Sequence, residues 1–491
     1  MEGLRPPSAR AWLNEPRRPT VIRTRERAFW LAVAAVCIGA AMGQLDASIV
    51  TVALPTLQVH FGVSLGSVTW VGLSYLLVLV ATVAAVGRLA DMVGRKLLYT
   101  YGFVIFTVGS ALCGVSTNLW MLNGFRVLQA VGAAMLQANS VAIIVLAVPR
   151  LSLGKAIGIQ GAAQAIGLAI GPTIGGLLLA AWGWRWIFFV NVPLGVLGTV
   201  AAVVCIPRSR FLQELVSFDW IGLGLFFPGV VALLSAVTFG DTSGWTSSRI
   251  LALGAAAVVL LVAFVVRESS TAHPMIDPAL FRSTPFTAGI TSGLLAYLVM
   301  FGVLFLVPYF AKHGLGLGAA RSGAELMVMP LLLGMTAPVA GRLADRFGPR
   351  ALTATGMVVV ALGLVAAGLW GTSTTVLLTS LGAIGVGLGL FTPPNNAAVM
   401  GSVDPAQSGL ASGVLNMTRG LGTSLGLALT GLVLTLAGGA ATKSTAQHSF
   451  TIAAFFLAGI SLIAGGLAAA RGATSLSGQR PEERSLSVLS E

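Results

Sequence analysis

The sequence has 491 residues, of which 56% are hydrophobic and 9% are charged. Soluble domains carry about 25% charged residues, so this composition excludes an ordinary soluble protein. The net charge of +13 on its own would suggest a nucleic-acid-binding protein. The basic residues, however, gather at the two termini and in short loops between apolar runs, where membrane proteins place them. We therefore expect no nucleic acid partner, because no soluble module could present the charge.

Apolar runs of about 20 residues recur along the chain, each long enough to cross a hydrocarbon core of about 30 Å. The runs are continuous rather than alternating with every second residue, which argues against a transmembrane barrel. The sequence therefore predicts an all-α polytopic membrane protein with fourteen transmembrane spans. The expected spans cover residues 28–52, 67–89, 97–116, 119–147, 155–181, 185–206, 217–239, 249–267, 285–311, 323–343, 351–370, 374–400, 408–437 and 450–470.

Both ends of the chain are expected to be cytoplasmic tails. Residues 1–27 are strongly basic and precede an apolar run that is too long for a cleaved signal peptide. Residues 471–491 are polar and rich in serine, which predicts a disordered tail. With both termini inside, most Lys and Arg residues of the loops fall on the cytoplasmic side, as the positive-inside rule requires. We expect the protein in the plasma membrane, in contact with lipid and as a monomer.

One short segment occurs twice, as Gly87–Lys96 after the second span and as Gly341–Arg350 after the tenth. Two copies on the same side of the membrane predict two related halves, as in transporters that rock around a central site. With six helices in each half, two helices are surplus and lie between the halves. The predicted division is a half at 28–206, the two additional helices at 207–267, a cytoplasmic linker at 268–284 and a second half at 285–470.

The repeated segment resembles the signature between the second and third helices of the major facilitator superfamily. The resemblance implies that Gly87, Asp91, Gly94 and Arg95 form a gate motif, with Gly341 and Asp345 as its second copy. The glycines allow a tight turn and close helix contact, and an acidic side chain can cap a helix end. A basic turn that only fixes orientation is the alternative for a single copy. The second copy ends in Pro-Arg instead of Arg-Lys, so we expect it to be mainly structural.

A second motif lies in the fifth span, where the run from Gly167 to Gly176 resembles the antiporter motif of drug exporters. The proline removes a backbone hydrogen bond and the glycines permit close packing, so the helix can bend. Gly167, Gly171, Pro172 and Gly175 are therefore predicted to shape a hinge. A face of small residues that only packs against a neighbour is the alternative.

Three further segments resemble the fourteen-helix drug:proton antiporter family within that superfamily. They are Leu45–Pro55 in the first span, Arg126–Ala134 in the fourth, where Ala130 replaces the usual glycine, and Trp184–Gly195 at the start of the sixth. The last segment can also be read as an aromatic interfacial belt with a buried asparagine and a kink. Together with the repeat, these motifs imply a major facilitator fold and transport of small molecules coupled to protons.

Four ionisable residues are predicted at membrane depth: Asp46, Arg126, Glu325 and Arg419. A charge in that position is costly and usually functional. Asp46 and Arg126 both fall in the outer half, where pairing would offset the cost of burial. We hypothesise that they interact and that protonation of Asp46 releases Arg126, in agreement with the role that the resemblance implies. A static pair that only fixes helix register is the alternative.

Glu325 has three possible roles: a second proton site, a binding group for cationic substrates, or a charge that reaches the outer surface near Arg321. Arg419 is expected to face the cavity, or to meet Glu325 or a substrate carboxylate. Polar residues recur on single faces of the fourth, fifth and thirteenth spans, and such stripes face a cavity or join helices to one another. The predicted cavity residues are Gln129, Gln137, Gln160, Gln164, Asn416 and Arg419.

No catalytic constellation competes with transport. The four histidines are far apart in sequence and lack metal-ligand spacing, so neither a metal nor a cofactor is expected, and the coupling ion is the proton. No Walker-type loop is present, so ATP is not expected to drive the protein directly. The sequence favours an exporter of small organic molecules, drugs or antibiotics among them, in exchange for protons. The rivals are a proton-coupled importer of a metabolite and a non-transporting membrane sensor or scaffold.

Overall fold

The computed structural model describes residues 15–19, 22, 28–63, 65–209, 218–244, 246–272, 274–315, 324–371, 373–438 and 443–471. Within these ranges the regular structure is entirely helical. Fourteen helices of the described chain are long and apolar enough to cross a membrane, which confirms the predicted number of spans.

The helices form two halves of six spans with two additional spans between them. The first half contains α2 (Phe29–Phe61), α3 (Leu65–Val93), α4 (Arg95–Gly114), α5 (Leu119–Ala147), α6 (Leu153–Trp182) and a sixth span made of α7 (Trp186–Phe189) and α8 (Asn191–Cys205). The additional helices are α9 (Trp220–Ser243) and α10 (Ser248–Ser270). The second half contains α11 (Thr284–His313), α13 (Val328–Phe347), α14 (Pro349–Trp370), α15 (Thr374–Gly401), α16 (Ser408–Leu436) and α17 (Lys443–Ala470).

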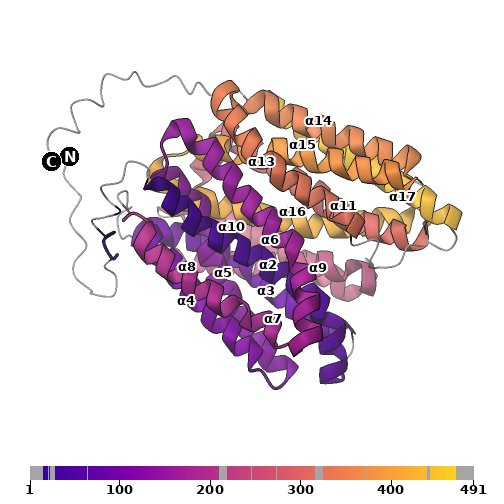
Figure 1. The fold of residues 1–491 in the computed structure, drawn as a ribbon, viewed down its shortest axis with the longest axis horizontal. Helices are drawn as coiled ribbons and strands as arrows, with labels where there is room; N and C mark the ends of the chain where they lie inside the picture. Colours follow the sequence, from indigo (N-terminus) through magenta and orange to yellow (C-terminus); the bar gives the residue numbers. More distant parts are fainter. Residues whose placement is uncertain are drawn as a thin grey trace.

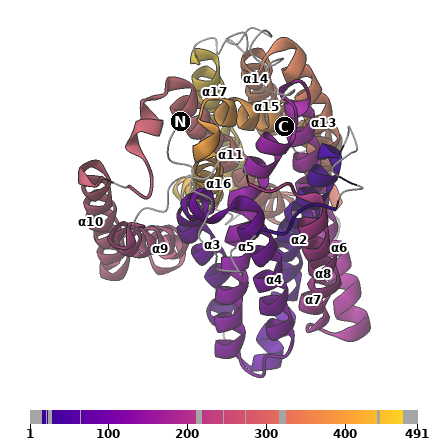
Figure 2. The same cartoon turned by 90° about the vertical axis from the view of Figure 1, so that its left-hand side faces the viewer.

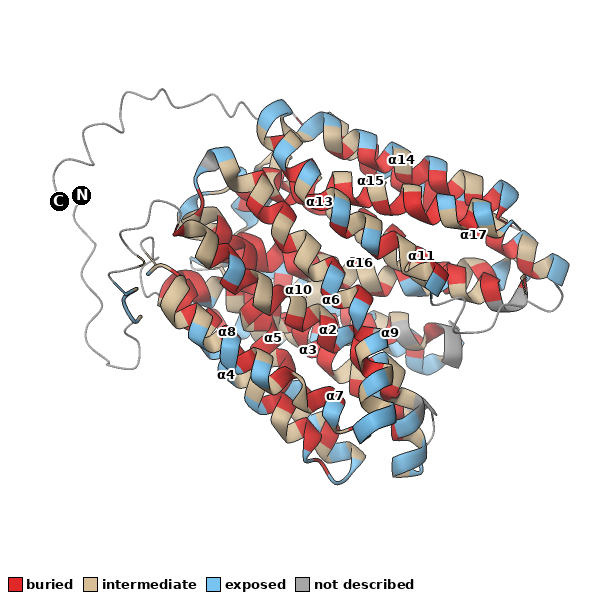
Figure 3. Ribbon diagram, in the orientation of Figure 1, coloured by how far each residue is buried: buried red, intermediate tan, exposed pale blue. Residues whose placement is uncertain are grey.

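The two halves approach each other at one end and spread apart toward the other (Figure 1). The main contacts between the halves are those of α3 with α16 and of α6 with α13. We call the end where the repeated segments lie the gate end. Buried residues gather on the inward faces of the helices, and exposed ones face away from the bundle (Figure 3). Because lipid is as apolar as the protein interior, these outward faces are rich in Leu, Val and Ile, as expected for membrane helices.

The two additional helices lie beside the bundle and not within it. α9 packs against both α3 and α16, and α10 packs against α9 (Figure 2). Only 17% of the α10 span is buried inside the protein, so most of its surface is left for lipid. Asp219 at the start of α9 and Arg267 near the end of α10 form an ion pair of 3.2 Å between the two helices.

The repeated segments contain almost no loop, which differs from the predicted span boundaries. Between α3 and α4 the only non-helical residue is Gly94, with φ of +124°, and Gly348 with φ of +82° plays the same part between α13 and α14. These left-handed values favour glycine, and they let the chain reverse within one residue. Asp91 and Arg95 are consequently helical, in the last turn of one helix and the first turn of the next.

Three other boundaries differ from the prediction, because hydropathy marks the part of a helix that lies within the membrane and not the whole helix. α2 continues beyond the predicted end at residue 52 as far as Phe61, and α17 begins at Lys443, before the predicted residue 450. Arg471, the first residue of the predicted C-terminal tail, is packed inside the second half with 4% of its surface exposed. Its guanidinium donates to the Ser292 hydroxyl at 2.6 Å. The remainder of that tail and residues 1–14 lie outside the described residues.

Candidate transport site

A buried ion pair lies in the middle of the first half. The Asp46 carboxylate on α2 and the Arg126 guanidinium on α5 are 2.7 Å apart, with 0% and 1% of their side chains exposed. The two helices run in opposite directions across the membrane, which brings these distant residues to the same depth. A buried pair of this kind is strongly destabilised when one partner is removed, by about 3–5 kcal/mol, because the other charge is left uncompensated.

Neutral donors complete the surroundings of the Asp46 carboxylate. Gln129 and Asn191 each donate an amide N–H to Asp46 Oδ1 at 2.9 Å. The Arg126 side chain donates in addition to Gln129 Oε1 at 2.7 Å and to the Val71 carbonyl at 3.0 Å. With these bonds the charged form of Asp46 is well solvated by the protein. Protonation of the carboxylate would therefore disturb several helices at once.

Asn191 is a member of this cluster that the sequence did not assign. It lies at the first residue of α8, in the aromatic segment of the sixth span, and is fully buried. It also donates to the Ser110 hydroxyl at 3.1 Å, so it joins α4 and α8 to the ion pair. The signal was present in the sequence as one polar amide inside an apolar and aromatic run. What the sequence did not show was the helix that the amide would meet.

A central cavity of about 370 Å³ lies between the two halves. Its wall includes Arg126 from the first half and Arg419 from the second, together with three of the predicted cavity residues, Gln137, Gln164 and Asn416. Asp46 is not part of the wall: its carboxylate lies behind Arg126. The Arg126 guanidinium thus lies between the Asp46 carboxylate and the cavity.

Two predicted cavity residues do not line the cavity. Gln129 is fully buried against Asp46 and Arg126, and its amide is used by both. Gln160 is buried between α5 and α6, where it donates to the Ser140 hydroxyl at 3.1 Å. Both amides join helices, which is the alternative role of polar residues in membrane helices.

Arg419 occupies the wall of the second half. Its guanidinium donates to Asn416 Oδ1 at 3.2 Å and to Gln164 Oε1 at 3.4 Å, so it touches both halves. It also lies over the Tyr297 ring, 5.2 Å from the centroid. Within the described part of the chain it forms no ion pair, with Glu325 or any other carboxylate.

Glu325 lies in a helical turn at the start of the tenth span, at the end of the bundle opposite the gate end. It is only 6% exposed, which argues against the predicted alternative in which its charge reaches the outer surface. It is not part of the cavity wall and does not belong to the Asp46 cluster. Arg321, its suggested partner, lies outside the described residues.

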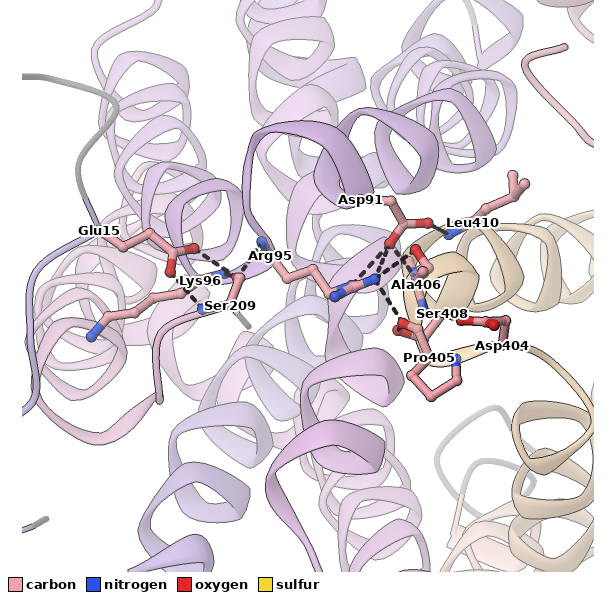
Figure 4. A network of polar contacts seen from close by, with 11 residues as sticks. Glu15, Asp91, Arg95, Lys96, Ser209, Asp404, Pro405, Ala406, Ser408 and Leu410 are labelled. Carbon is pink, nitrogen blue, oxygen red and sulfur yellow. Dashed lines mark hydrogen bonds and ion pairs between the residues drawn. The ribbon is translucent and has the colours of Figure 1, made fainter. Parts of the chain in front are cut away.

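At the gate end, the first repeated segment joins the two halves. The Asp91 carboxylate accepts the backbone N–H groups of Gly409 and Leu410, both at 2.8 Å, in the first turn of α16 (Figure 4). Arg95 holds Asp91 from the other side, with its Nε at 2.9 Å, and donates to the carbonyls of Pro405 and Ala406. A carboxylate at a helix N-terminus is stabilised by the free N–H groups and the helix dipole.

Close backbone approach makes this contact possible. A Cβ atom added at Gly87 would lie 2.4 Å from the Gly409 carbonyl oxygen, and one at Gly341 would lie 2.0 Å from the Gly154 carbonyl oxygen. The glycines of the motif are therefore required by the distance between α3 and α16 and between α6 and α13.

The second copy makes the same kind of contact in the opposite direction. Asp345, on α13 of the second half, accepts the backbone N–H groups of Gly154 at 2.7 Å and of Lys155 at 3.0 Å in the first turn of α6. Pro349 stands where the first copy has Arg95, so this carboxylate lacks the arginine that supports Asp91. The second copy, which the sequence predicts to be mainly structural, thus also joins the two halves.

A segment of the predicted N-terminal tail supports the first gate contact. Glu15 accepts the backbone N–H and the hydroxyl of Ser209, at 2.6 and 2.8 Å, and the N–H of Leu97 at 3.3 Å (Figure 4). Ser209 in turn accepts the N–H of Arg95 at 3.0 Å. Lys96 donates to the carbonyl of Pro16 at 2.8 Å. The start of α4 is therefore capped by residues from the tail, a long-range contact without any local sequence signal.

The predicted hinge glycines pack α6 against α2. An added Cβ would lie 2.4 Å from the Ala41 carbonyl oxygen at Gly167, 1.8 Å from Ser48 Oγ at Gly171 and 2.8 Å from Ile49 Cγ1 at Gly175. The helix is continuous through Pro172. Close packing, the alternative for this segment, is thus present, and at Gly171 and Gly175 it involves Ser48 and Ile49, which follow Asp46 in α2.

These features place a central cavity between two helical halves. A family model for the Major Facilitator Superfamily matches residues 36–219 and 289–489. The chain belongs to the major facilitator superfamily. The interval between the two matched stretches contains α9 and α10, the helices beyond the twelve that the halves supply. As a member of this superfamily, the protein is a transporter and not an enzyme.

Several characterised members of the superfamily are similar over most of the chain. The riboflavin transporter RibZ of Clostridioides difficile is 35% identical over 401 residues, which is 81% of this chain and 87% of the relative. The multidrug resistance protein Stp of Mycobacterium tuberculosis is 33% identical over 407 residues, 82% of this chain and 75% of the relative. The tetracenomycin C resistance and export protein of Streptomyces glaucescens is 34% identical over 412 residues, 82% and 76% of the two chains.

The fold is shared with solved structures of much lower sequence identity. The human organic anion transporter MFSD10 aligns with a TM-score of 0.65 at 15% identity, over 90% of this chain and 99% of the other. The proton:xylose symporter XylE aligns with a TM-score of 0.64 at 13% identity, over 89% and 94%. The major facilitator fold is therefore established.

Proposed function

We propose that this protein exports small organic molecules, drugs or antibiotics among them, across the plasma membrane in exchange for protons. The observation that carries the proposal is the Asp46–Arg126 pair, with its carboxylate buried and its guanidinium in the cavity wall. Burial of a charge at this depth is costly, and charged residues retained there are usually functional. The relatives named for multidrug resistance and for tetracenomycin C export support the direction of transport.

The proposed cycle uses alternating access, with both termini and the gate end in the cytoplasm. In this proposal the Asp91 and Asp345 contacts close the cytoplasmic end, and the cavity opens toward the outside. Protonation of Asp46 from that side removes the charge that holds Arg126. Arg126 is then free for another partner, and the halves rearrange. The α6 segment with Gly167, Gly171, Pro172 and Gly175 would act as the hinge.

The coupling energy comes from the membrane. Each elementary charge that crosses gains about 2.3 kcal/mol per 100 mV of potential, in addition to any pH gradient. No cofactor is required, and a monomer suffices because the cavity is enclosed by the two halves of one chain. Glu325 is a second candidate for carrying a proton, since its carboxylate is buried in the tenth span.

Everted membrane vesicles test the proposal. Addition of a substrate such as tetracenomycin C should dissipate a preformed pH gradient, and Asp46→Asn should abolish this response while the protein still reaches the membrane. Asp219→Asn is the control, because Asp219 lies outside both halves, where it accepts the N–H of Gly222 and pairs with Arg267. Normal coupling in Asp46→Asn would refute the role of Asp46.

Import of a metabolite is the second candidate function. It is favoured by the relative named as a riboflavin transporter, which is 35% identical. Uptake of riboflavin by right-side-out vesicles, driven by an inward proton gradient, would support import. Accumulation by everted vesicles only would support export. A protein that moves neither substrate nor protons in either preparation would instead fit a membrane sensor.

A further inference from the structure

The charge in the cavity wall is entirely basic among the described residues. Arg126 and Arg419 line the cavity, and the described wall contains neither Asp nor Glu. Arg126 already has a counter-charge, because Asp46 lies 2.7 Å behind it. Arg419 has none within the described chain. The cavity therefore carries one unbalanced positive charge, and that charge belongs to Arg419.

The hydrogen bonds of Arg419 are long and incomplete. The amide oxygens of Asn416 and Gln164 accept from the same atom, Nη1, at 3.2 and 3.4 Å. Typical N–H···O bonds measure about 2.7–3.2 Å, so the guanidinium is only partly satisfied. Its Nε is buried without a partner among the described atoms. A carboxylate or phenolate oxygen that entered the cavity would supply both the acceptor and the missing charge, and a carboxylate could bind the guanidinium with two bonds.

The remainder of the wall suits an apolar body. Tyr75 and Leu76 from the first half line it together with Met300, Phe301 and Leu333 from the second. The cavity volume of about 370 Å³ falls within the range of about 300–1,000 Å³ of small-molecule sites. Aromatic rings can pack against such a wall while a single polar group reaches the arginine.

We propose that the central cavity binds amphipathic organic anions, with the anionic group on Arg419 and an aromatic body between Tyr75 and Phe301. This rests on the proposed function, in which the cavity is the substrate site. A lipophilic cation meets only like charge here and has no carboxylate to pair with. The proposed direction agrees with this choice, because a membrane potential that is negative inside drives anions outward.

Two dyes with the same ring system and opposite charge test the proposal: fluorescein, an anion, and rhodamine methyl ester, a cation. Binding to the purified full-length protein in lipid nanodiscs is followed by fluorescence anisotropy, without any gradient. Fluorescein should bind about tenfold more tightly than the rhodamine ester or better. Arg419→Gln should weaken the binding of fluorescein by about tenfold. It should strengthen the binding of the rhodamine ester, because the charge that repels the cation is gone.

Two further variants test whether the preference depends on the positive charge of Arg419. Arg419→Lys keeps the charge and should retain most of the preference for fluorescein. Arg249→Gln removes a positive charge from the exposed start of α10 and should change neither affinity. A gain of cation affinity in Arg419→Gln also proves that this variant is folded.

The proposal is overturned if the rhodamine ester binds to the unmodified protein as tightly as fluorescein, if fluorescein does not bind, or if Arg419→Gln leaves both affinities unchanged. None of these outcomes depends on proton coupling or on the direction of transport. A failure of the vesicle experiment with Asp46→Asn would thus leave the charge preference of the cavity standing, and the reverse holds as well.

Discussion

Asp91 and Asp345 make reciprocal contacts between the two halves. Each carboxylate sits at the end of a helix in its own half and accepts two backbone N–H groups from the first turn of a helix in the other half. The gate end is thus closed by two helix caps that cross the interface in opposite directions. Only Asp91 is backed by an arginine, so the two contacts are not of equal strength.

Asn at either position should favour opening of the gate end. A neutral amide loses the charge that interacts with the helix N-terminus, which is worth about 1–2 kcal/mol in a buried contact, or a factor of roughly 5–30 in the equilibrium between the two states. Spin labels at Leu151 and Arg350 report the gate end, and labels at Val59 and Leu436 report the opposite end. In Asp91→Asn and Asp345→Asn the first distance should lengthen and the second should shorten.

The matched control is Asp219→Asn, which removes a capping carboxylate whose bonds lie within the two additional helices. It should leave both distances unchanged. Equal distance distributions in all variants would show that the two interhalf caps do not determine which end is open.

Arg126→Lys should impair transport although lysine keeps the positive charge. The guanidinium bonds simultaneously to Asp46, Gln129 and the Val71 carbonyl, and it stacks 4.2 Å from the Tyr75 ring centroid. An ammonium group cannot reproduce this fork or the stacking. Transport should fall by about tenfold or more, which corresponds to about 1.4 kcal/mol.

Arg267→Lys is the control for the loss of a guanidinium, because Arg267 bonds to Asp219 between the two additional helices, outside both halves. Rates within twofold of the unmodified protein are expected there, and the same result for Arg126→Lys would show that only the charge of Arg126 matters.

Gly171→Ala should destabilise the contact between α2 and α6. The new methyl group would meet Ser48 Oγ at 1.8 Å and Ser48 Cβ at 2.9 Å, so the helices must separate or shift. Overpacking of this kind costs about 1–3 kcal/mol. Gly176, in the same helix, has no atom within 4 Å of an added Cβ, so Gly176→Ala should be neutral or slightly stabilising.

Thermal unfolding in detergent and transport rates distinguish these variants. Ser48→Ala combined with Gly171→Ala should recover part of the lost stability, because it removes the nearer of the two clashing atoms. A Gly171→Ala protein as stable and active as Gly176→Ala would contradict the packing described for the hinge segment.

Glu15→Ala should release the N-terminal segment from the first half. The carboxylate accepts three hydrogen bonds, from the backbone and hydroxyl of Ser209 and from the backbone of Leu97. Their loss leaves the first turn of α4 without this cap, an effect of about 1 kcal/mol. Limited proteolysis should cleave within residues 15–19 faster, and the gate end should open more often, since Ser209 also holds Arg95. Arg17→Ala, which alters an exposed neighbour, should do neither.

The spans and the central ion pair were predictable because each follows from one strong physical constraint. A hydrocarbon core requires long apolar helices, and hydropathy therefore predicted all fourteen. Two opposite charges at the same depth, such as Asp46 and Arg126, stabilise each other more than either is stabilised alone. Hydropathy could not locate helix ends that project from the membrane, as in α2 and α17.

The neighbours of polar groups were less predictable. Gln129 and Gln137 lie on the same side of α5, yet only Gln137 lines the cavity, because the packing of α2 against α5 covers Gln129. Asn191 and Glu15 contact residues far away in sequence, and no periodicity reports such contacts. Helical spacing indicates a face, and only the arrangement of the other helices determines what that face meets.

The position of α9 makes the protein asymmetric toward the lipid. The two halves meet along two lateral seams, one between α3 and α16 and the other between α6 and α13. α9 lies across the first seam, in contact with both of its helices, while α9 and α10 lie on the side of the bundle away from α6 and α13 (Figure 2). A lipid-dissolved molecule that approaches from the bilayer therefore meets α9 at one seam and α6 and α13 themselves at the other.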